Sequence, residues 1–192
     1  MPNKVEFGLS NIHFGTYTYD AETKKVTLGA PYHLPGAVNL SLEVEAEDSP
    51  FHADNGVYYN SFSSAGSKGE LEMALFPDEF KQKFLGYKKT KDGGVTKPFG
   101  ATSGAVYMAF EADGDKNKTR VVLYNCALGE IQREYSTTEK SKEPVTEKLP
   151  FSCSGDTATG IWKSQYTPEA AGYASIFTSP EAPVLSDTVE GA

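Results

Sequence analysis

The stretch that decides the fold covers residues 36–62 and reads GAVNLSLEVEAEDSPFHADNGVYYNSF. Its first part alternates strictly between apolar and polar side chains. The apolar residues are Val38, Leu40, Leu42, Val44 and Ala46. The polar residues between them are Asn39, Ser41, Glu43, Glu45 and Glu47. Because successive side chains of a strand point to opposite faces, the pattern predicts a β-strand with one core-facing side and one polar side.

The polar side of this strand carries a ladder of carboxylates at Glu43, Glu45 and Glu47. Side chains two residues apart on a strand are about 7 Å apart, so the three charges repel one another. A solvated strand face that discourages aggregation is one interpretation of such a ladder. The other is a surface whose function depends on its negative charge.

Charge and length limit the class of protein. The chain has 192 residues and a formal net charge of −8. This length predicts one domain with a sizeable core. The negative charge argues against a nucleic-acid-binding protein, because such binding depends on cations that meet phosphates.

The two cysteines, Cys126 and Cys153, are interpreted from the expected compartment. The N-terminal residues show no apolar signal-peptide core, and no apolar run reaches the length of a membrane span. Synthesis in a reducing cytoplasm is therefore expected, and it favours two free thiols over a pairing of the two.

Outward from the deciding stretch, most of the chain has the pattern of β-strands. A long polar loop with one short strand at 57–62 is expected over 48–69, because Pro, Gly and Ser are frequent there. One helix is expected over 78–85, since Pro77 and two acids precede a stripe of apolar residues and Gly86 follows it. A hairpin is expected from residues 105–112 and 119–127. Further strands are expected at 5–9, 12–19, 24–28, 70–76, 130–135 and 145–153.

These elements predict a mainly β fold, an antiparallel two-sheet sandwich or barrel with one short flanking helix at about residues 77–86. The domain is expected to cover residues 1–163. Beyond Lys163 there are four acidic residues and no cation, and prolines oppose regular structure. Residues 164–192 are therefore expected to form an acidic C-terminal arm.

No motif of an enzyme or a metal site is recognisable. The sequence from Asp113 to Asn117 begins like a calcium loop, but Lys118 and Tyr124 stand where that loop needs Gly and Glu. The three histidines lack metal-ligand spacing. We therefore expect no catalytic residue, no cofactor and no metal.

Ordered fragments along the chain resemble one family. They are PGAV at 35–38, ADNGVYY at 53–59, GELE at 69–72, LFPDEF at 75–80, LG at 85–86, AFE at 109–111, DGD at 113–115 and RVVLYNC at 120–126. In this order and spacing they resemble the major tail proteins, or tail tube proteins, of bacteriophages with long non-contractile tails. Each fragment alone is a turn or a piece of strand, and the resemblance covers roughly residues 5–154.

The resemblance implies a structural virion protein. Such subunits form β-sandwiches that join into rings, expected to be hexameric, and the rings stack into a tube through which genomic DNA is ejected. The implied partners are further copies of the chain and the tape-measure, tail-tip and tail-terminator proteins, with only transient, non-specific passage of DNA and no membrane. The implied location is the virion tail, after synthesis in the host bacterial cytoplasm.

Within such a tube, three sets of residues are candidates for a role. The lumen-facing set is Glu43, Glu45 and Glu47, because a carboxylate wall offers no cation to phosphates. An inter-ring loop is expected at Asp54, Asn55, Tyr58 and Tyr59. Lysines that complement the acidic arm are Lys88, Lys89, Lys91 and Lys97.

Two alternatives stay open. One is a monomeric carbohydrate-binding β-sandwich with aromatic platforms at Tyr58, Tyr59, Trp162 and Tyr166. The other is the tube protein of a contractile tail or of a related secretion system, which the sequence separates poorly from the first interpretation.

Overall fold

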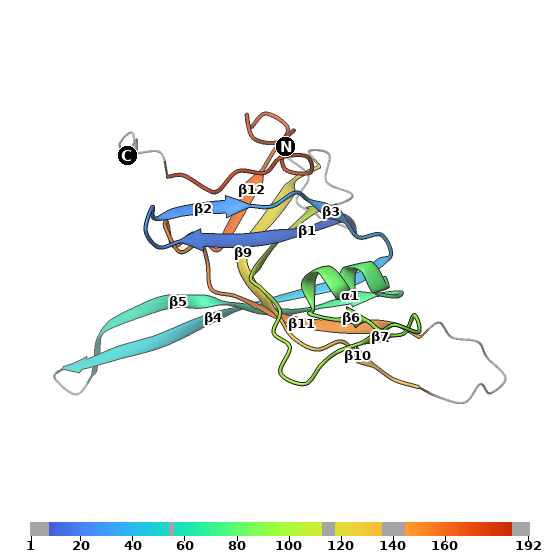
Figure 1. The fold of residues 1–192 in the computed structure, drawn as a ribbon. Helices are drawn as coiled ribbons and strands as arrows, with labels where there is room; N and C mark the ends of the chain where they lie inside the picture. The colour runs from blue at the N-terminus through green and yellow to red at the C-terminus, as the bar shows by residue number, and fades with distance from the viewer. Residues whose placement is uncertain (1–7, 54–55, 113–117, 136–144, 186–192) are drawn as a thin grey trace.

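The computed structural model describes residues 8–53, 56–112, 118–135 and 145–185, with side chains described outside 45–53 and 56–65. The chain is mainly β, with one helix in this described part (Figure 1). The helix is α1 (Asp78–Phe84). The strands are β1 (Leu9–Asp20), β2 (Lys25–Leu28), β3 (Tyr32–His33), β4 (Ala37–Ala53), β5 (Gly56–Met73), β6 (Lys88–Lys89), β7 (Val95–Thr96), β8 (Val106–Ala112), β9 (Arg120–Leu128), β10 (Gln132–Arg133), β11 (Glu147–Cys153) and β12 (Lys163–Tyr166).

One antiparallel sheet, in the order β2-β1-β8-β9-β11-β5-β4, bends into two layers. The change of layer occurs at β9, whose first half pairs with β12 and whose last residues pair with β11. Strands β1, β2 and β8 therefore lie above β4, β5 and β11 (Figure 1). This arrangement confirms the predicted mainly β, two-layer antiparallel class with a flanking helix.

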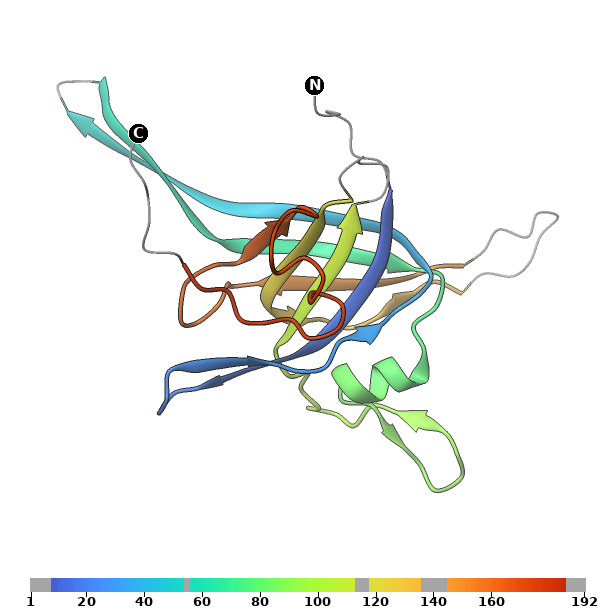
Figure 2. The same cartoon turned by 90° about the horizontal axis from the view of Figure 1, so that it is seen from above.

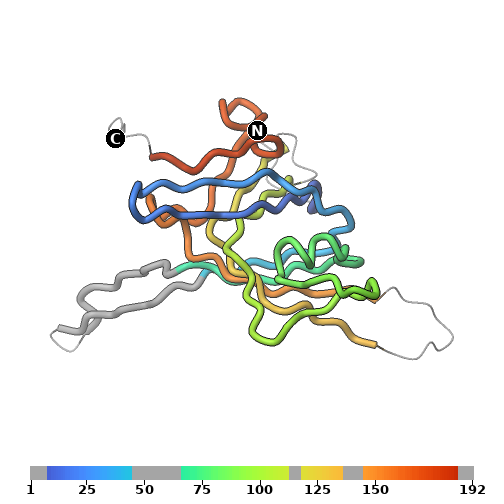
Figure 3. Tube along the Cα trace, in the orientation of Figure 1, coloured from blue at the N-terminus to red at the C-terminus, as the bar shows by residue number. Residues whose placement is uncertain are grey.

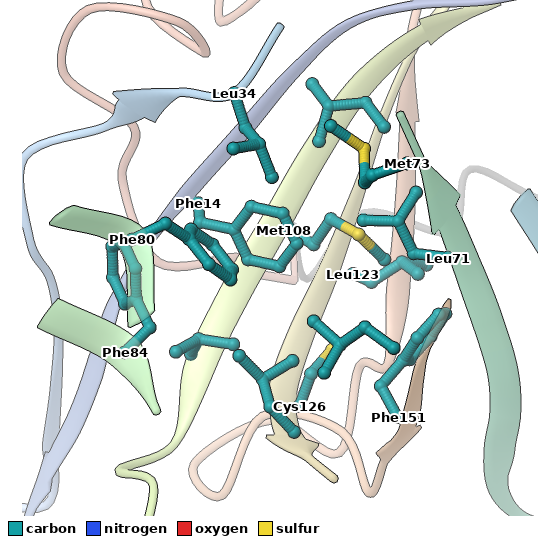
Figure 4. Close-up of a cluster of buried hydrophobic side chains, with 14 of the residues drawn as sticks. Phe14, Leu34, Leu71, Met73, Phe80, Phe84, Met108, Leu123, Cys126 and Phe151 are labelled. Carbon is teal, nitrogen blue, oxygen red and sulfur yellow. The ribbon is translucent and has the colours of Figure 1, made fainter. Parts of the chain in front are cut away.

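The main core fills the space between the layers. Phe14 of β1 and Met108 of β8 meet Leu71 and Met73 of β5, and all four side chains are at most 1% exposed (Figure 4). Phe80 of α1 closes one side of this space, and its ring lies 5.0 Å from that of Phe14 in an edge-on contact. The helix thus acts as a side wall of the sandwich.

The predicted helix is confirmed almost to the residue. Pro77 precedes it, Asp78 and Glu79 occupy its first turn, and Phe80 and Phe84 are buried on one face. The helix ends before Gly86, whose φ of +73° is the left-handed conformation that favours glycine after a helix.

The prediction of a long loop over residues 48–69 is wrong. Strands β4 and β5 instead form a 17- and 18-residue hairpin that pairs from Ala37↔Met73 to Ala53↔Gly56. Its register shifts at three places along the ladder. The pairing uses backbone groups, so a run of Ser and Gly supports it although it lacks apolar alternation.

The predicted free thiols are also wrong, because Cys126 and Cys153 form a disulfide. The two residues are 27 positions apart in sequence and are direct partners in the β9–β11 ladder. The sequence argument used only the compartment, and it had no register that would place the two residues opposite each other.

The start of the expected C-terminal arm belongs to the sheet. Residues 164–166 lie in β12, which pairs with β9. The described continuation, residues 167–185, runs across the outer side of the upper layer (Figures 2 and 3). The described part of the segment thus packs on its own subunit, whereas a domain boundary after Lys163 stays a prediction.

Candidate functional site

The polar side of the lower layer is built from three strands. Antiparallel pairing aligns Asn39 of β4 with Glu72 of β5, and Glu72 with Lys148 of β11. The next rows along the same side are Ser41–Glu70–Pro150 and Glu43–Lys68–Ser152. Asn39, Ser41 and Glu43 are exposed, as the alternation predicts. We call the side formed by Asn39, Ser41, Glu43, Lys68, Glu70, Glu72 and Lys148 the polar face.

The polar face carries both signs of charge. The Lys148 ammonium lies 3.2 Å from the Glu70 carboxylate. The hydrogen bond and the negative charge of Glu70, helped by Glu72, raise the pKa of Lys148. The Thr146 hydroxyl donates a hydrogen bond to Glu72. The sequence argument missed the contributions of β5 and β11. The alternation of residues 70–73 indicated a strand, but it did not say which strand lies beside it.

Parts of the predicted carboxylate ladder fall outside the described side chains. Glu43 is confirmed as exposed in β4. Glu45 and Glu47 lie in the backbone of the same strand, opposite Gly66 and Ser63, but their side chains are not described.

The opposite side of β4 is apolar and partly uncovered. Leu40 and Leu42 pack against the main core. Val38 and Val44 are 54% and 53% exposed, although their side of the strand is the one predicted to face the core. In the described part of the chain β4 has a ladder to β5 alone and is the last strand of the sheet order. The molecule therefore presents an open strand edge with apolar side chains along it.

The predicted docking lysines lie on and around the β6–β7 hairpin. Lys88, Lys89 and Lys91 are exposed. Lys97 instead forms an ion pair with Glu130, and its ammonium lies 5.5 Å from the centre of the Tyr87 ring. Lys97 is thus held within its own region, and docking of the acidic arm on the other three lysines stays a prediction.

The side chains of the predicted inter-ring residues all lie outside the described part of the structure. Asp54 and Asn55 lie outside the described residues. Tyr58 and Tyr59 belong to β5, where Tyr59 is the register partner of Phe51. Their side chains are not described.

Two buried carboxylates have structural partners. Glu147, the residue that breaks the apolar pattern of β11, accepts a hydrogen bond of 2.7 Å from the backbone N–H of Phe76. It also pairs with Arg133 at 3.3 Å and with Lys81 at 3.9 Å. Asp156 accepts hydrogen bonds from the backbone N–H groups of residues 158 and 159 and from the Tyr17 hydroxyl.

Other titrating groups also have structural explanations. Burial raises the pKa of Tyr107 and Tyr124, so both phenols stay neutral. Among the described residues, no three His, Cys, Asp or Glu side chains are grouped so as to hold a metal ion. None of the described helices is long and apolar enough to cross a membrane.

The fold and the site together define a two-layer antiparallel β protein with an open edge strand and an exposed polar sheet face. Comparison of the sequence with protein-family models and with curated proteins gave no match. Among solved structures, a chain of an extracellular contractile injection system, the PVC sheath–tube complex in the extended state, is similar. It has 9% identity and a TM-score of 0.48 over 85% of this chain and 94% of that chain.

A chain of the anti-feeding prophage cap, described as the tube-terminating cap, has 8% identity and a TM-score of 0.46, over 86% of this chain and 95% of that chain. A chain of the PVC sheath/tube terminator in the extended state has 9% identity and a TM-score of 0.45, over 78% of this chain and 94% of that chain. Similarities at these values carry no conclusion about function.

Proposed function

We propose that this protein is the structural subunit of a tail tube, in which copies join side by side into rings and the rings stack. The observation that carries the proposal is the open edge of β4 with Val38 and Val44 half exposed beside it. The motif order that resembles tail tube proteins of long non-contractile bacteriophage tails supports the same function. In the finer form of the proposal, the rings are hexameric and genomic DNA passes through the tube.

An open edge of this kind invites association with another strand. Its unpaired N–H and C=O groups are a template for strand addition, which soluble monomers normally prevent. A head-to-tail contact that closes on rotation gives a ring and pairs every edge. A second head-to-tail contact between rings does not close and therefore gives a filament.

The polar face is proposed to line the lumen. Nonspecific attraction of DNA depends on cations that replace the counterions of the phosphates. On this face Lys148 is paired with Glu70, and Lys68 is the register partner of Glu43. The carboxylates of Glu43, Glu70 and Glu72 therefore outnumber the two ammonium groups. DNA is therefore expected to pass along the face without being held by it.

The wider assembly follows from the proposed tube. The partners would be the tape-measure, tail-tip and tail-terminator proteins, and the chain would reside in the virion tail and carry out no catalysis. The tube of a contractile tail or of a related secretion system is the alternative within the same class, since the open edge and the polar face suit both.

The carbohydrate-binding alternative gains no support from the described residues. Trp162 packs against the main core. Tyr166 packs against a second apolar cluster, and its hydroxyl lies 3.4 Å from that of Tyr124. Two of the four predicted aromatic platforms are thus engaged within the molecule.

The test compares a lysine placed at the open edge with one placed elsewhere. Val44→Lys puts a charge on the apolar side of β4, and Leu75→Lys is its matched control, because Leu75 is 52% exposed and lies outside the strands. We expect sedimentation velocity to show large assemblies for the wild type and Leu75→Lys, and monomers for Val44→Lys with an unchanged circular dichroism spectrum. Assembly of Val44→Lys at the wild-type concentration would overturn the edge as the ring contact.

A further inference from the structure

The described C-terminal residues 167–185, which we call the strap, cover the outer side of the upper layer (Figure 2). The strap inserts Ile176, 3% exposed, into a second apolar cluster. The other buried members of this cluster are Tyr17, Val26, Tyr107, Ala109, Val122 and Tyr124. These residues come from β1, β2, β8 and β9, so the strap is the cover of an apolar surface on the far side of the sheet from the main core.

Arg120 of β9 fastens the strap. Its guanidinium carbon lies 3.9 Å from the centre of the Tyr173 ring and 4.3 Å from that of Phe177. Its Nη1 donates a hydrogen bond of 2.6 Å to the Tyr173 carbonyl oxygen, and its Nε donates one of 3.2 Å to Glu111 of β8. Because the guanidinium is mostly buried, these stacking contacts and charged hydrogen bonds are stronger than they would be in water.

His13 of β1 holds the same aromatic ring. It stacks on Phe177 with ring centres 4.5 Å apart and planes at 19°. Its Nδ1 lies 2.9 Å from the Asn11 carbonyl oxygen, so the neutral ring donates from Nδ1. The ring of His33 in β3 lies 4.9 Å away. The imidazole is 8% exposed, and it is therefore packed between the strap and the sheet.

We propose that His13 makes the strap a pH-sensitive latch: the strap is docked while His13 is neutral and detaches from the sheet when His13 is protonated. Protonation would place a buried cation on the same Phe177 ring that the Arg120 guanidinium already contacts, and next to the ring of His33. Glu111 of β8 is the nearby anion, and it is engaged with Arg120.

The pKa of His13 agrees in sign with this geometry. Burial lowers it most, the charges of His33 and Arg120 lower it further, and the hydrogen bond to Asn11 opposes them. A lowered pKa in the docked state means that the undocked state binds the proton more tightly. Docking is therefore strongest above the ordinary imidazole pKa of about 6.5, weakens as the pH falls below it, and is weakest below the lowered pKa of docked His13.

Release of the strap would uncover the apolar cluster around Val122. The latch thus decides whether this surface is covered by its own chain or open to another molecule. The inference does not depend on ring formation, because every contact in it lies within one subunit.

The test is hydrogen exchange of the intact protein, read by mass spectrometry on peptides from the strap. Exchange is compared at pH 7.5 and pH 5.5, with labelling times scaled for the intrinsic pH dependence of exchange. We expect a several-fold loss of strap protection at the lower pH while the peptides of β8 and β9 stay protected. Equal protection of the strap at both pH values would overturn the proposal.

Two histidine variants separate the latch from general acid sensitivity. His13→Gln has no charge at either pH and should remove most of the pH dependence. His52→Gln is the matched control, because His52 lies in β4 of the other layer, and it should keep the full dependence. If His13→Gln retained the wild-type pH dependence, the latch would be excluded.

A direct titration guards against a variant that does not fold. The pKa of His13 in the wild-type protein, measured by NMR, should lie below the ordinary imidazole value. A value at or above the ordinary one would contradict the latch, whatever the variants do.

Discussion

At the scale of the residue, Glu147 is a buried carboxylate that holds several elements together. Its side chain is 4% exposed and connects β11 to the segment before α1, to α1 itself and to β10, through Phe76, Lys81 and Arg133. In β11 this residue shares a side of the strand with the apolar residues Leu149, Phe151 and Cys153 and is the polar exception among them. The partners that explain the exception come from three other places in the chain, which no local pattern reveals.

Removal of the Glu147 carboxylate should be costly. Glu147→Ala leaves the Phe76 N–H without its acceptor and Arg133 without its paired carboxylate, and it removes one of the two carboxylates near Lys81. We expect a loss of about 3–5 kcal/mol in the free energy of unfolding, the usual cost of breaking a buried pair. Glu130→Ala breaks a pair whose carboxylate side chain is 69% exposed, and it should cost at most about 1 kcal/mol. Urea unfolding at pH 7 measures both, and equal losses would contradict the assigned role.

Arg120 makes a second prediction at this scale. Arg120→Lys keeps the charge but loses the planar group that stacks on Tyr173 and Phe177. Strap amides should therefore exchange faster at pH 7.5 in this variant than in the wild type. Lys118→Arg is the control and should leave strap exchange unchanged, because the Tyr173 hydroxyl donates its hydrogen bond to the backbone carbonyl of residue 118 and not to the side chain. Unchanged protection in Arg120→Lys would show that the stacking does not fasten the strap.

At the scale of the element, local signals predicted α1 and the β8–β9 hairpin because each is set by its own residues. They failed for β4 and β5, whose distal parts pair through the backbone without apolar alternation. They also failed for the disulfide, which depends on the register between β9 and β11. Of the candidate site, the polar exposure of β4 was predictable, whereas the charges that β5 and β11 place beside it were not.

The end of α1 gives a prediction for a single glycine. At Gly86 the φ is +73°, and an added Cβ would lie 3.2 Å from the Thr102 carbonyl oxygen. Gly86→Ala should cost about 1–2 kcal/mol, from the strained backbone and the crowding. Gly104→Ala is the control, because an added Cβ at that position meets nothing within 4 Å. Thermal unfolding should show a lowered Tm for Gly86→Ala and a Tm close to that of the wild type for Gly104→Ala.

The disulfide gives a prediction for the ladder between β9 and β11. Because Cys126 and Cys153 are 27 residues apart, closing that loop should contribute about 2–4 kcal/mol to the free energy of unfolding. Denaturant unfolding with and without reductant should show the difference, and the double variant with alanine at both positions should be insensitive to reductant. Two free thiols titrated in the denatured, unreduced wild type would contradict the bond.

At the scale of the whole molecule, the polar face and the open edge lie on the same strand, so ring formation and the character of the lumen are linked. In the proposed tube, β4 would contribute its backbone edge to assembly, its apolar side to the contact between subunits and its polar side to the lumen. The acidic C-terminal segment was predicted to be an arm, but its described part, residues 167–185, packs on its own subunit.

Charge reversal on the polar face tests the lumen. Glu43→Lys adds a cation where DNA is proposed to pass, whereas Glu22→Lys makes the same change in the exposed turn after β1. Both variants should assemble, but only Glu43→Lys should show salt-dependent retention of DNA by the tubes. Changing Glu43, Glu45 and Glu47 together to Lys should strengthen the retention of DNA and impair its ejection. Normal ejection from such particles would count against the lumen assignment.

The measurement that tests the tube most directly is negative-stain electron microscopy of the purified, concentrated wild-type protein with no other component. The account predicts rings or hollow tubes of uniform width. Particles of monomer size alone, at every concentration reached, would contradict it.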